Sequence, residues 1–357
     1  MNNSRKQPVN GILLLYHHPL LDNAPTIMDH VNAFSRYSRF KVWNVNTELG
    51  FPGGLRRFQF QIIILHYSLC SYPFYQLNAD FMNYLGECSS SYKIAFYQDE
   101  FRYCRQRFDF INQNNINCVY TLLEPDYFKE VYRKYTNVSK LVYTLPGYFN
   151  DHLLKNAERL EKSYDEREID IGYRGRQLPF YCGKGGQEKH EIGVLFRQKA
   201  AGLDLKIDIE TDEYKRIYGS SWYRFLSNCR AVLGVEAGVS IFDLEDKVRL
   251  ECENILRKKP RTSFPELSKI ILNQRENNIY YRTISPRHFE SAVFRVSQIL
   301  FEGKYSGIMR PMVHYLPLKK DFSNFDEVVK QFKNKSLWRE ITENAYNDLI
   351  ASGRYSY

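Results

Sequence analysis

The sequence lacks the marks of several common protein classes. Its seven cysteines are scattered, with no CxxC pair, which argues against a disulfide framework and against a zinc site. No stretch approaches the roughly 20 apolar residues that span a bilayer, and residues 1–10 lack the apolar core of a signal peptide. We therefore expect a cytoplasmic protein without a membrane span.

Several catalytic and binding motifs are missing as well. The sequence has no GxGxxG dinucleotide fingerprint, no P-loop, no HExxH motif and no nucleophile elbow. It has no DxD motif of the kind that holds a metal against a diphosphate, so we expect neither a bound metal nor a cofactor. A zinc-finger signature, an RNA-recognition signature and a long Lys/Arg run are also missing, so nucleic acid is not an expected partner.

What the chain does have is length and positive charge. Its 357 residues, of which 43% are hydrophobic, are enough for two cores, so we expect two domains. The formal net charge of +9 is not concentrated in one arm. A basic balance of this kind favours anionic small molecules or lipid headgroups as partners, and simple solubility is the alternative explanation.

Short apolar runs alternate along the chain with segments of helical pattern. Runs such as 11–16, 61–65, 92–97, 169–173 and 278–281 predict strands, and segments such as 26–37 and 188–201 predict helices. This alternation predicts α/β domains with mainly parallel sheets covered on both faces. We expect two Rossmann-like, doubly wound domains that face a central cleft, with ligands bound where the strands end.

The composition divides the chain into three parts. A charged stretch at 156–168, poor in aliphatic residues, predicts a hinge between an N-terminal domain at 1–160 and a second domain at 169–333. The remaining segment, 334–357, contains a predicted amphipathic helix at 337–351.

One short segment in the last third of the chain is the most informative. Ser285 suits a helix N-cap and Pro286 the first helical position. A helix start attracts anions, and Arg287 and His288, expected to point outward, would strengthen that attraction. Glu290 is placed to accept hydrogen bonds from sugar hydroxyls, or it only complements the helix dipole. The segment predicts a site for a sugar nucleotide.

Two other loops carry charge after predicted strands. Arg174, Arg176 and Lys184 lie in a Gly-bearing loop that can approach phosphates closely; the alternative is a flexible surface loop with solvated arginines. Glu236 follows the predicted strand 231–235, where it points into a cleft or stands in a tight turn as a solvated carboxylate. Both loops are candidates for donor contacts.

Polar residues also end three predicted strands of the first domain. His17 and His18 end the first strand, His66 ends the third, and Asp99 and Glu100 end the fourth. Histidine and carboxylate groups can orient or deprotonate a hydroxyl, and Asp99 is the best single candidate for that work. The alternative is that the histidines only satisfy local backbone groups.

At this point the chain resembles a known family. The segments 284–290, 301–307 and 314–324 look like the C-terminal domain of bacterial GT-B glycosyltransferases, in the group labelled glycosyl transferase family 1 or CgeB-like. Shorter parallels lie at 172–176, at 216–222 and at Glu236 to Asp243. The N-terminal domain matches only by its rhythm of strands and helices.

The resemblance implies a nucleotide-sugar donor on the second domain and a glycan acceptor on the first. It implies that Arg287 and His288 meet the phosphates and that Glu290 accepts from the ribose. The other donor-binding candidates are Arg174, Arg176, Ile217, Tyr218, Glu236, Tyr305, Ser306 and Gly307. The catalytic candidates are Asp99, His17 and His18. The final helix is expected to cross back to the first domain.

The function that the resemblance implies is a metal-independent hexosyl- or pentosyltransferase. It would move a sugar to a glycan or lipid-linked acceptor during synthesis of a bacterial capsule or lipopolysaccharide O-antigen, in the cytoplasm or at the inner face of the plasma membrane. Arg282 and Thr283 stand where many retaining enzymes carry a first Glu, so retention and inversion both stay open. So do two alternatives: an inactive nucleotide-binding scaffold in polysaccharide or spore-coat assembly, and a sugar-nucleotide epimerase.

Overall fold

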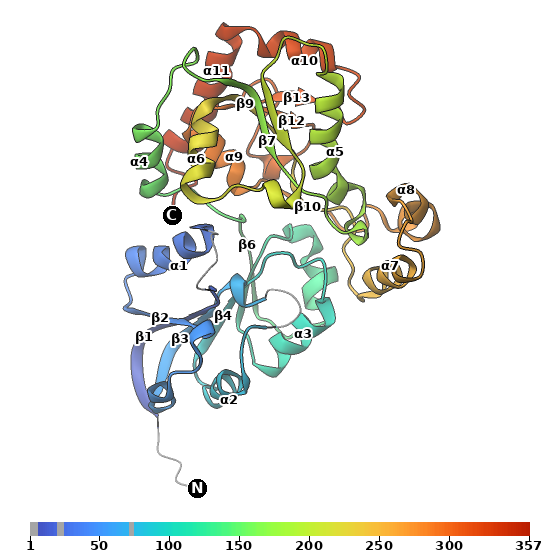
Figure 1. Cartoon of the computed structure of the whole chain (residues 1–357). Helices are drawn as coiled ribbons and strands as arrows, with labels where there is room; N and C mark the ends of the chain where they lie inside the picture. The colour runs from blue at the N-terminus through green and yellow to red at the C-terminus, as the bar shows by residue number, and fades with distance from the viewer. Residues whose placement is uncertain (1–5, 20–24, 71–74) are drawn as a thin grey trace. The chain divides into compact units, whose positions relative to one another are not determined.

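The computed structural model describes residues 6–19, 25–70 and 75–357, which form two compact units (Figure 1). The first unit runs to Thr144 and also includes 243–247. The second unit contains 145–242 and 248–357. The stretch 145–160, which the sequence analysis assigns to the first domain, packs with the second unit.

The first unit contains a six-stranded sheet in which all neighbouring strands are parallel, in the order β2-β1-β3-β4-β5-β6. The strands are β1 (Gln7–Tyr16), β2 (Val42–Asn46), β3 (Phe58–Leu65), β4 (Tyr92–Phe96), β5 (Cys118–Thr121) and β6 (Lys140–Tyr143). Leu13, Leu14 and Leu15 of β1 are all fully buried. Successive side chains point to opposite faces, so both faces of β1 are covered, as its apolar run predicts.

Three α-helices accompany this sheet. They are α1 (Pro25–Tyr37), α2 (Ala79–Glu87) and α3 (Cys104–Gln113), with short 3-10 or π turns at 47–49, 53–57, 67–70, 125–127 and 129–133. Val31 of α1 packs with Ile12, Leu14 and Ile64 of the sheet. Asn78 begins α2 by accepting hydrogen bonds from the next backbone N–H groups, which a helix start leaves unpaired.

The second unit contains a five-stranded parallel sheet in the order β13-β12-β9-β7-β8. Its strands are β7 (Ile169–Arg174), β8 (Ile207–Glu210), β9 (Cys229–Gly234), β12 (Ser297–Phe301) and β13 (Leu316–Leu318). In the middle of β9, Val232 joins one buried cluster while Ala231 and Leu233 join another. Because neighbouring residues of a strand face opposite sides, this sheet too has a core on each face.

Helices cover both faces of the second sheet. The α-helices are α4 (Asp151–Arg159), α5 (Gly183–Lys199), α6 (Gly219–Asn228), α7 (Lys247–Lys258), α8 (Phe264–Leu267), α9 (Pro286–Val293), α10 (Phe325–Phe332) and α11 (Lys335–Tyr346), with short 3-10 or π turns at 180–182, 213–215, 268–272, 273–275, 305–307 and 347–351. Phe225 of α6 and Phe289 of α9 belong to one cluster, whereas Phe196 of α5 and Val328 of α10 belong to the other. The sheet is therefore doubly wound.

One predicted strand lies outside the main sheets. The expected strand at 278–281 is instead β11 (Tyr281–Thr283), which pairs in antiparallel fashion with β10 (Ala237–Val239). Gly238 allows this pairing because its φ is +93° and a Cβ there would lie 2.0 Å from the Tyr281 carbonyl oxygen.

The C-terminal helix packs within the second unit. Ala345 of α11 and Leu349, just beyond the helix, belong to the same buried cluster as Phe289 of α9. The predicted return of this helix to the first domain stays a prediction. No helix in the described part of the chain combines the length and the apolar character that crossing a membrane requires.

Each sheet has a point where the chain reverses its direction of winding. From β7 the chain moves outward to β8 and then returns to β9 on the other side of β7; β1, β2 and β3 repeat this pattern in the first unit. The loops that follow β7 and β9, or β1 and β3, diverge at such a point. Open α/β sheets bind their ligands there.

Candidate functional site

The start of α9 has the cap that the sequence predicts. Ser285 is the N-cap and Pro286 occupies the first turn. The backbone N–H of Ser285 donates to Nδ1 of His288 over 2.9 Å, and the two side chains lie 3.1 Å apart. This reciprocal arrangement is a capping box in which histidine takes the place of the usual Glu or Gln.

His288 does not point outward as expected. Its side chain is 3% exposed, and burial lowers its pKa to about 3, so the ring is neutral at physiological pH. The imidazole packs edge-on against Tyr305, with ring centroids 5.1 Å apart. His288 therefore holds the helix start in shape and does not add a positive charge there; its contact with a donor stays a prediction.

Arg287 is the cation that the helix start does present. Its side chain is exposed, its guanidinium lies over the Trp222 ring at 4.9 Å, and it donates to the Arg174 carbonyl. Among the described residues no carboxylate forms an ion pair with it. The guanidinium is oriented by an aromatic ring and a carbonyl, and its charge is available to an anion.

Glu290 lies one turn along the same helix. Its Oε2 accepts a hydrogen bond from the Trp222 indole over 2.7 Å. Trp222 thus contacts both Arg287 and Glu290 and fixes the two charged groups relative to each other. Trp222 was not among the predicted donor-binding residues, although it lies in the 216–222 segment that resembles the GT-B family.

A tight turn after β12 adjoins this helix start. Tyr305, Ser306 and Gly307 all have positive φ, at +45°, +56° and +71°. Ser306 Oγ lies 2.8 Å from Thr283 Oγ1 and accepts from the Ile284 N–H over 3.2 Å. The structure therefore brings the turn and the helix start together, as expected, although Tyr305 itself is fully buried.

Glu236 stabilises that turn by accepting hydrogen bonds from its backbone. It is 5% exposed and accepts from the Tyr280 hydroxyl at 2.9 Å, the Lys304 N–H at 3.1 Å and the Tyr305 N–H at 2.8 Å. From the sequence, Glu236 was expected either to point into a cleft or to stand in a tight turn as a solvated carboxylate. The carboxylate is instead buried and bonded, which makes it a positioning group for the turn.

A buried ion-pair network surrounds Glu236. Arg282 donates to Glu188, which also pairs with Lys320 at 2.7 Å, and the Arg282 Nε lies 3.9 Å from Glu236. Arg282 and Glu188 are both less than a tenth exposed. Burying charge is tolerable only when it is paired and hydrogen-bonded. No sequence pattern indicated Glu188, because its partners come from distant segments.

The two arginines predicted to contact phosphates, Arg174 and Arg176, both pair with carboxylates, but to different degrees. Arg174 donates to Asp208 Oδ2 over 2.8 Å and stacks on Phe225 at 4.4 Å, with 11% of its side chain exposed. Arg176 is exposed and forms a loose pair with Glu213 at 3.4 Å. Arg174 therefore anchors the loop that receives Arg287, whereas Arg176 stays accessible.

The predicted base-contacting stretch lies before α6. Tyr218 is the N-cap residue of α6, is 43% exposed and has the Arg216 guanidinium over its ring at 4.9 Å. Ile217 packs partly buried against the cluster that contains Phe289. Tyr218 thus offers an accessible ring, and Ile217 secures the loop.

In the first unit, the structure brings the residues that follow β1 and β3 together. The His17 N–H donates to Ser68 Oγ over 3.0 Å, and the His66 N–H donates to the Leu15 carbonyl. The His18 N–H and carbonyl bond to the Asn46 side chain. His17 and His18 therefore lie at the winding reversal of the first sheet, half-buried and held by their backbones.

His66 lies beneath them and makes a contact that sequence reasoning missed. It is fully buried, and its Nε2 lies 2.9 Å from His30 Nδ1. Burial lowers the pKa of His30 to about 4, and burial together with His30 lowers that of His66 well below its usual value. Both rings are neutral near pH 7, and the helical position of His30 gave no sequence signal.

Asp99 follows β4 and is exposed, with φ at +53°. In the part of the chain that the structure covers, no hydrogen bond or ion pair engages its carboxylate. Its neighbour Glu100 differs: it is fully buried and accepts from Thr121 Oγ1 and the Leu122 N–H, and burial raises its pKa. Asp99 is the accessible carboxylate of the pair.

No three His, Cys, Asp or Glu side chains of the described residues converge in a way that could hold a metal ion.

Solved structures resemble this architecture over nearly its whole length. Anabaena HepE, solved with UDP and glucose, is 8% identical, and the match covers 98% of this chain and 96% of HepE at a TM-score of 0.52. The chain has the GT-B fold. An alpha-glucosyltransferase solved with UDP-glucose and abasic DNA shares this GT-B likeness at 10% identity, with coverage of 98% and 96% and a TM-score of 0.50. The sucrose-phosphate synthase of Thermosynechococcus elongatus is 11% identical, and the match covers 97% of this chain and 94% of the synthase at a TM-score of 0.50.

These likenesses concern the GT-B fold alone, because the identities are low. The chain spans about half (52%) of the length of TarM, at a TM-score of 0.42. No protein-family model matches the sequence, and no curated protein matches it either. The predicted fold class is confirmed, and the CgeB-like group stays a prediction.

Proposed function

We propose that this protein is a glycosyltransferase that takes a sugar from a nucleotide-sugar donor, with a UDP-sugar as the leading candidate. The observation that carries the proposal is the capped start of α9. There Arg287, which is exposed and has no ion-pair partner among the described residues, and Glu290 both contact Trp222. The GT-B fold supports it, as do the UDP and UDP-glucose bound to HepE and to the alpha-glucosyltransferase.

In this proposal, α9 and its neighbours bind the donor. Arg287 and the backbone N–H groups of the helix start neutralise the diphosphate, and Glu290 accepts from the ribose hydroxyls. The turn at 305–307 borders the phosphates, and Tyr218 borders the base. Catalysis comes from orientation and from stabilising charge on the departing phosphate.

The acceptor binds to the first unit in the same proposal. Asp99 takes the proton from the attacking hydroxyl, because it is an exposed carboxylate without a partner among the described residues. His17 and His18 orient the acceptor or replace Asp99 as the base. A base that activates the acceptor directly belongs to an inverting reaction; a retaining one would depend on stabilisation of the leaving group.

Three finer parts of the proposal rest on the sequence. The reaction needs no metal, because no DxD motif is present and Arg287 supplies positive charge. The acceptor is a glycan or lipid-linked glycan of a bacterial surface polysaccharide. The basic balance suits a cytoplasmic protein that docks on the inner face of the plasma membrane.

A thermal-shift series with UDP, GDP, ADP and CMP tests the donor site. A ligand that binds only the folded state raises the melting temperature in proportion to its affinity and concentration. We expect one nucleotide, UDP first, to raise the melting temperature of the wild type but not of Arg287→Ala. Equal shifts in both proteins would show that the nucleotide binds elsewhere.

An inactive nucleotide-binding scaffold is the second candidate. The observation that favours it is Arg282, which is buried in ion pairs where many retaining enzymes carry a glutamate. Slow hydrolysis of UDP-glucose or another donor distinguishes the two. Release of free nucleotide supports the enzyme, whereas binding without any hydrolysis or transfer supports the scaffold.

A further inference from the structure

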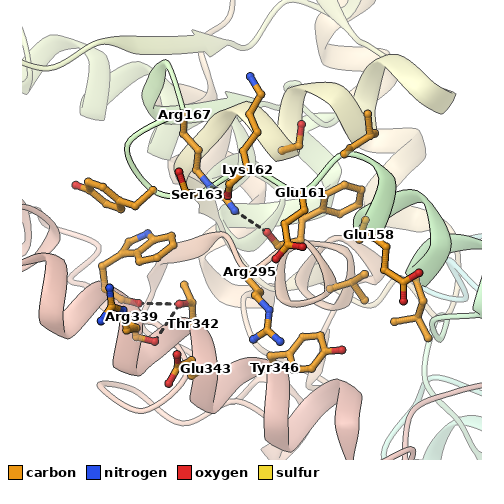
Figure 2. A pocket seen from close by; sticks show the side chains of 18 of the residues that line it. Glu158, Glu161, Lys162, Ser163, Arg167, Arg295, Arg339, Thr342, Glu343 and Tyr346 are labelled. Carbon is orange, nitrogen blue, oxygen red and sulfur yellow. Dashed lines mark hydrogen bonds between the residues drawn. The ribbon is translucent and has the colours of Figure 1, made fainter.

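A cavity of about 670 Å³ opens in the second unit (Figure 2). It lies at the amino ends of the sheet strands, whereas the candidate donor site lies at their carboxyl ends. Its lining residues come before the strands: Arg167 precedes β7, Ser227 precedes β9 and Arg295 precedes β12. At the candidate donor site, by contrast, Arg174 is the last residue of β7, and the turn at 305–307 follows β12. With about 3.3 Å per strand residue, the two sites lie about 20 Å apart.

The cavity is large enough for a small organic ligand, since such sites typically measure about 300–1,000 Å³. Its walls are formed by the end of α4, the segment 160–167, the end of α9 and one side of α11. Four aromatic residues line it: Tyr164, Phe294, Trp338 and Tyr346.

Charged side chains of both signs line the same walls. The acidic ones are Glu158, Glu161 and Glu343, and the basic ones are Lys162, Arg167, Arg295 and Arg339 (Figure 2). No ion pair with any described residue engages these seven groups, although oppositely charged groups share the cavity. A cavity that keeps hydrogen-bond donors and acceptors apart offers both to a ligand.

Arg295 reaches this cavity from a strained position. It comes directly after Phe294, the C-cap of α9, with φ at +49°, in the place where glycine commonly ends a helix. The N–H of Val296 donates to the Ser291 carbonyl, and that of Arg295 to the Ala292 carbonyl, which completes a Schellman motif. An arginine with a Cβ is disfavoured in this conformation, and strain of this kind concentrates at functional sites.

The Arg295 guanidinium is held in place by an aromatic ring. It lies over the Tyr346 ring at 3.7 Å from the centroid. Nearby, Arg167 is 3% exposed, and its guanidinium donates to the carbonyls of Cys229 and Phe294. Burial lowers the pKa of Arg167 to about 10, so it stays charged at neutral pH.

We propose that this cavity binds a segment of a neutral oligosaccharide, away from the reaction centre. Sugar hydroxyls donate to carboxylates and accept from guanidinium groups, while sugar C–H faces pack on aromatic rings. The lining has three acidic and four basic groups, so its charges nearly balance and favour neither an anion nor a simple cation, whereas a neutral ligand can bond to both kinds of group. The inference rests on the proposed function, because a glycan-extending enzyme has such a chain to hold.

The experiment is a binding screen of the full chain on an array of immobilised oligosaccharides, neutral and sulfated, at 50 and 300 mM NaCl. Arg295→Gly removes the guanidinium and places the favoured residue in the left-handed position, so its melting temperature should equal or exceed that of the wild type. Glu343→Gln removes a charge at constant size. Arg287→Ala alters only the donor site.

We expect the wild type to retain at least one neutral oligosaccharide at both salt concentrations. Arg295→Gly and Glu343→Gln should each weaken that binding at least tenfold, and Arg287→Ala should leave it unchanged. The inference is overturned if no neutral oligosaccharide binds, if both cavity variants bind like the wild type, or if only sulfated chains bind and salt releases them.

The outcomes also separate this inference from the proposed function. UDP binding that depends on Arg287, without glycan binding, contradicts the cavity site alone. Glycan binding that depends on Arg295, without any nucleotide binding, contradicts the donor site and leaves the cavity as a saccharide site.

Discussion

The two winding reversals of this protein carry the same topology but different chemistry. In the first unit the loops after β1 and β3 hold His17, His18 and His66, which bond to backbone groups, to polar side chains and, for His66, to His30 of α1. In the second unit Glu236, which follows β9, lies beside the buried ion pair of Arg282 and Glu188, and the exposed Arg287 stands at the nearby start of α9. The fold supplies the place, and the side chains decide whether it suits a hydroxyl or an anion.

The largest expected effect concerns the first unit. Asp99→Asn keeps the shape of the side chain but cannot take a proton, so we expect turnover to fall by about 100- to 10,000-fold. UDP affinity should not change. Steady-state kinetics with the identified donor and acceptor measure the effect. Asp109→Asn, an exposed change on α3, is the control, and unchanged turnover in Asp99→Asn would rule out Asp99 as the base.

The second effect concerns stability in the second unit. Glu236→Ala removes the acceptor of three hydrogen bonds and leaves Arg282 with less compensating charge. We expect the free energy of unfolding to fall by about 3–5 kcal/mol, as when one partner of a buried pair is removed. Urea denaturation checks this. Glu302→Ala, an exposed neighbour, should change it by less than about 0.5 kcal/mol.

A smaller effect should separate charge from geometry at α9. Arg287→Lys keeps the positive charge but loses the planar guanidinium. That group stacks on Trp222 and can donate two parallel hydrogen bonds to a phosphate. We expect UDP to bind about tenfold more weakly than to the wild type, and Arg287→Ala to be weaker still. Calorimetric titration measures both. Arg224→Ala, an exposed change on α6, should bind UDP normally; equal losses in all three variants would contradict a specific role for Arg287.

The smallest effect is a pH dependence that both units share. His30 and His288 have pKa values lowered to about 4 and about 3, so the folded protein binds their protons less readily than the unfolded chain does. Their contribution to stability is complete above about pH 6.5 and is lost as the pH falls toward these values. Each histidine should add a slope of about 1.4 kcal/mol per pH unit in that range.

Denaturation at several pH values between 4 and 7.5 tests this. In His288→Asn the amide oxygen can still accept from the Ser285 N–H but does not titrate, so the slope should become shallower by one proton. A slope unchanged by this substitution would mean that His288 is not neutral in the folded protein.

Local patterns in the sequence predicted much of the fold. The apolar runs predicted β1, β3 and β7, because strands buried on both faces must be apolar throughout. The residues Ser285 and Pro286 predicted the start of α9, because capping depends on neighbours in sequence. The strand expected at 278–281 was displaced to β11, since its pairing with β10 depends on a distant glycine, Gly238.

The candidate site was less predictable than the fold. Arg287 and Arg174 have the same side chain, yet one is exposed and the other is bound to Asp208. His288 stands beside Arg287 in the sequence but turns into the core. The helical periodicity of about 100° per residue separates neighbouring side chains, and only the packing shows which of them meets solvent.

The sequence by itself determined the alternation of strands and helices, the capped start of α9 and the positive charge of the chain, because these depend on residue type and on short spacings. Only the tertiary structure decided which charges are neutralised. Glu188, Arg282 and Glu236 are far apart in the chain and become partners through folding. Whether a charged group is satisfied depends on neighbours in space, and so the folded arrangement alone left Arg287 and Arg295 without a carboxylate partner among the described residues.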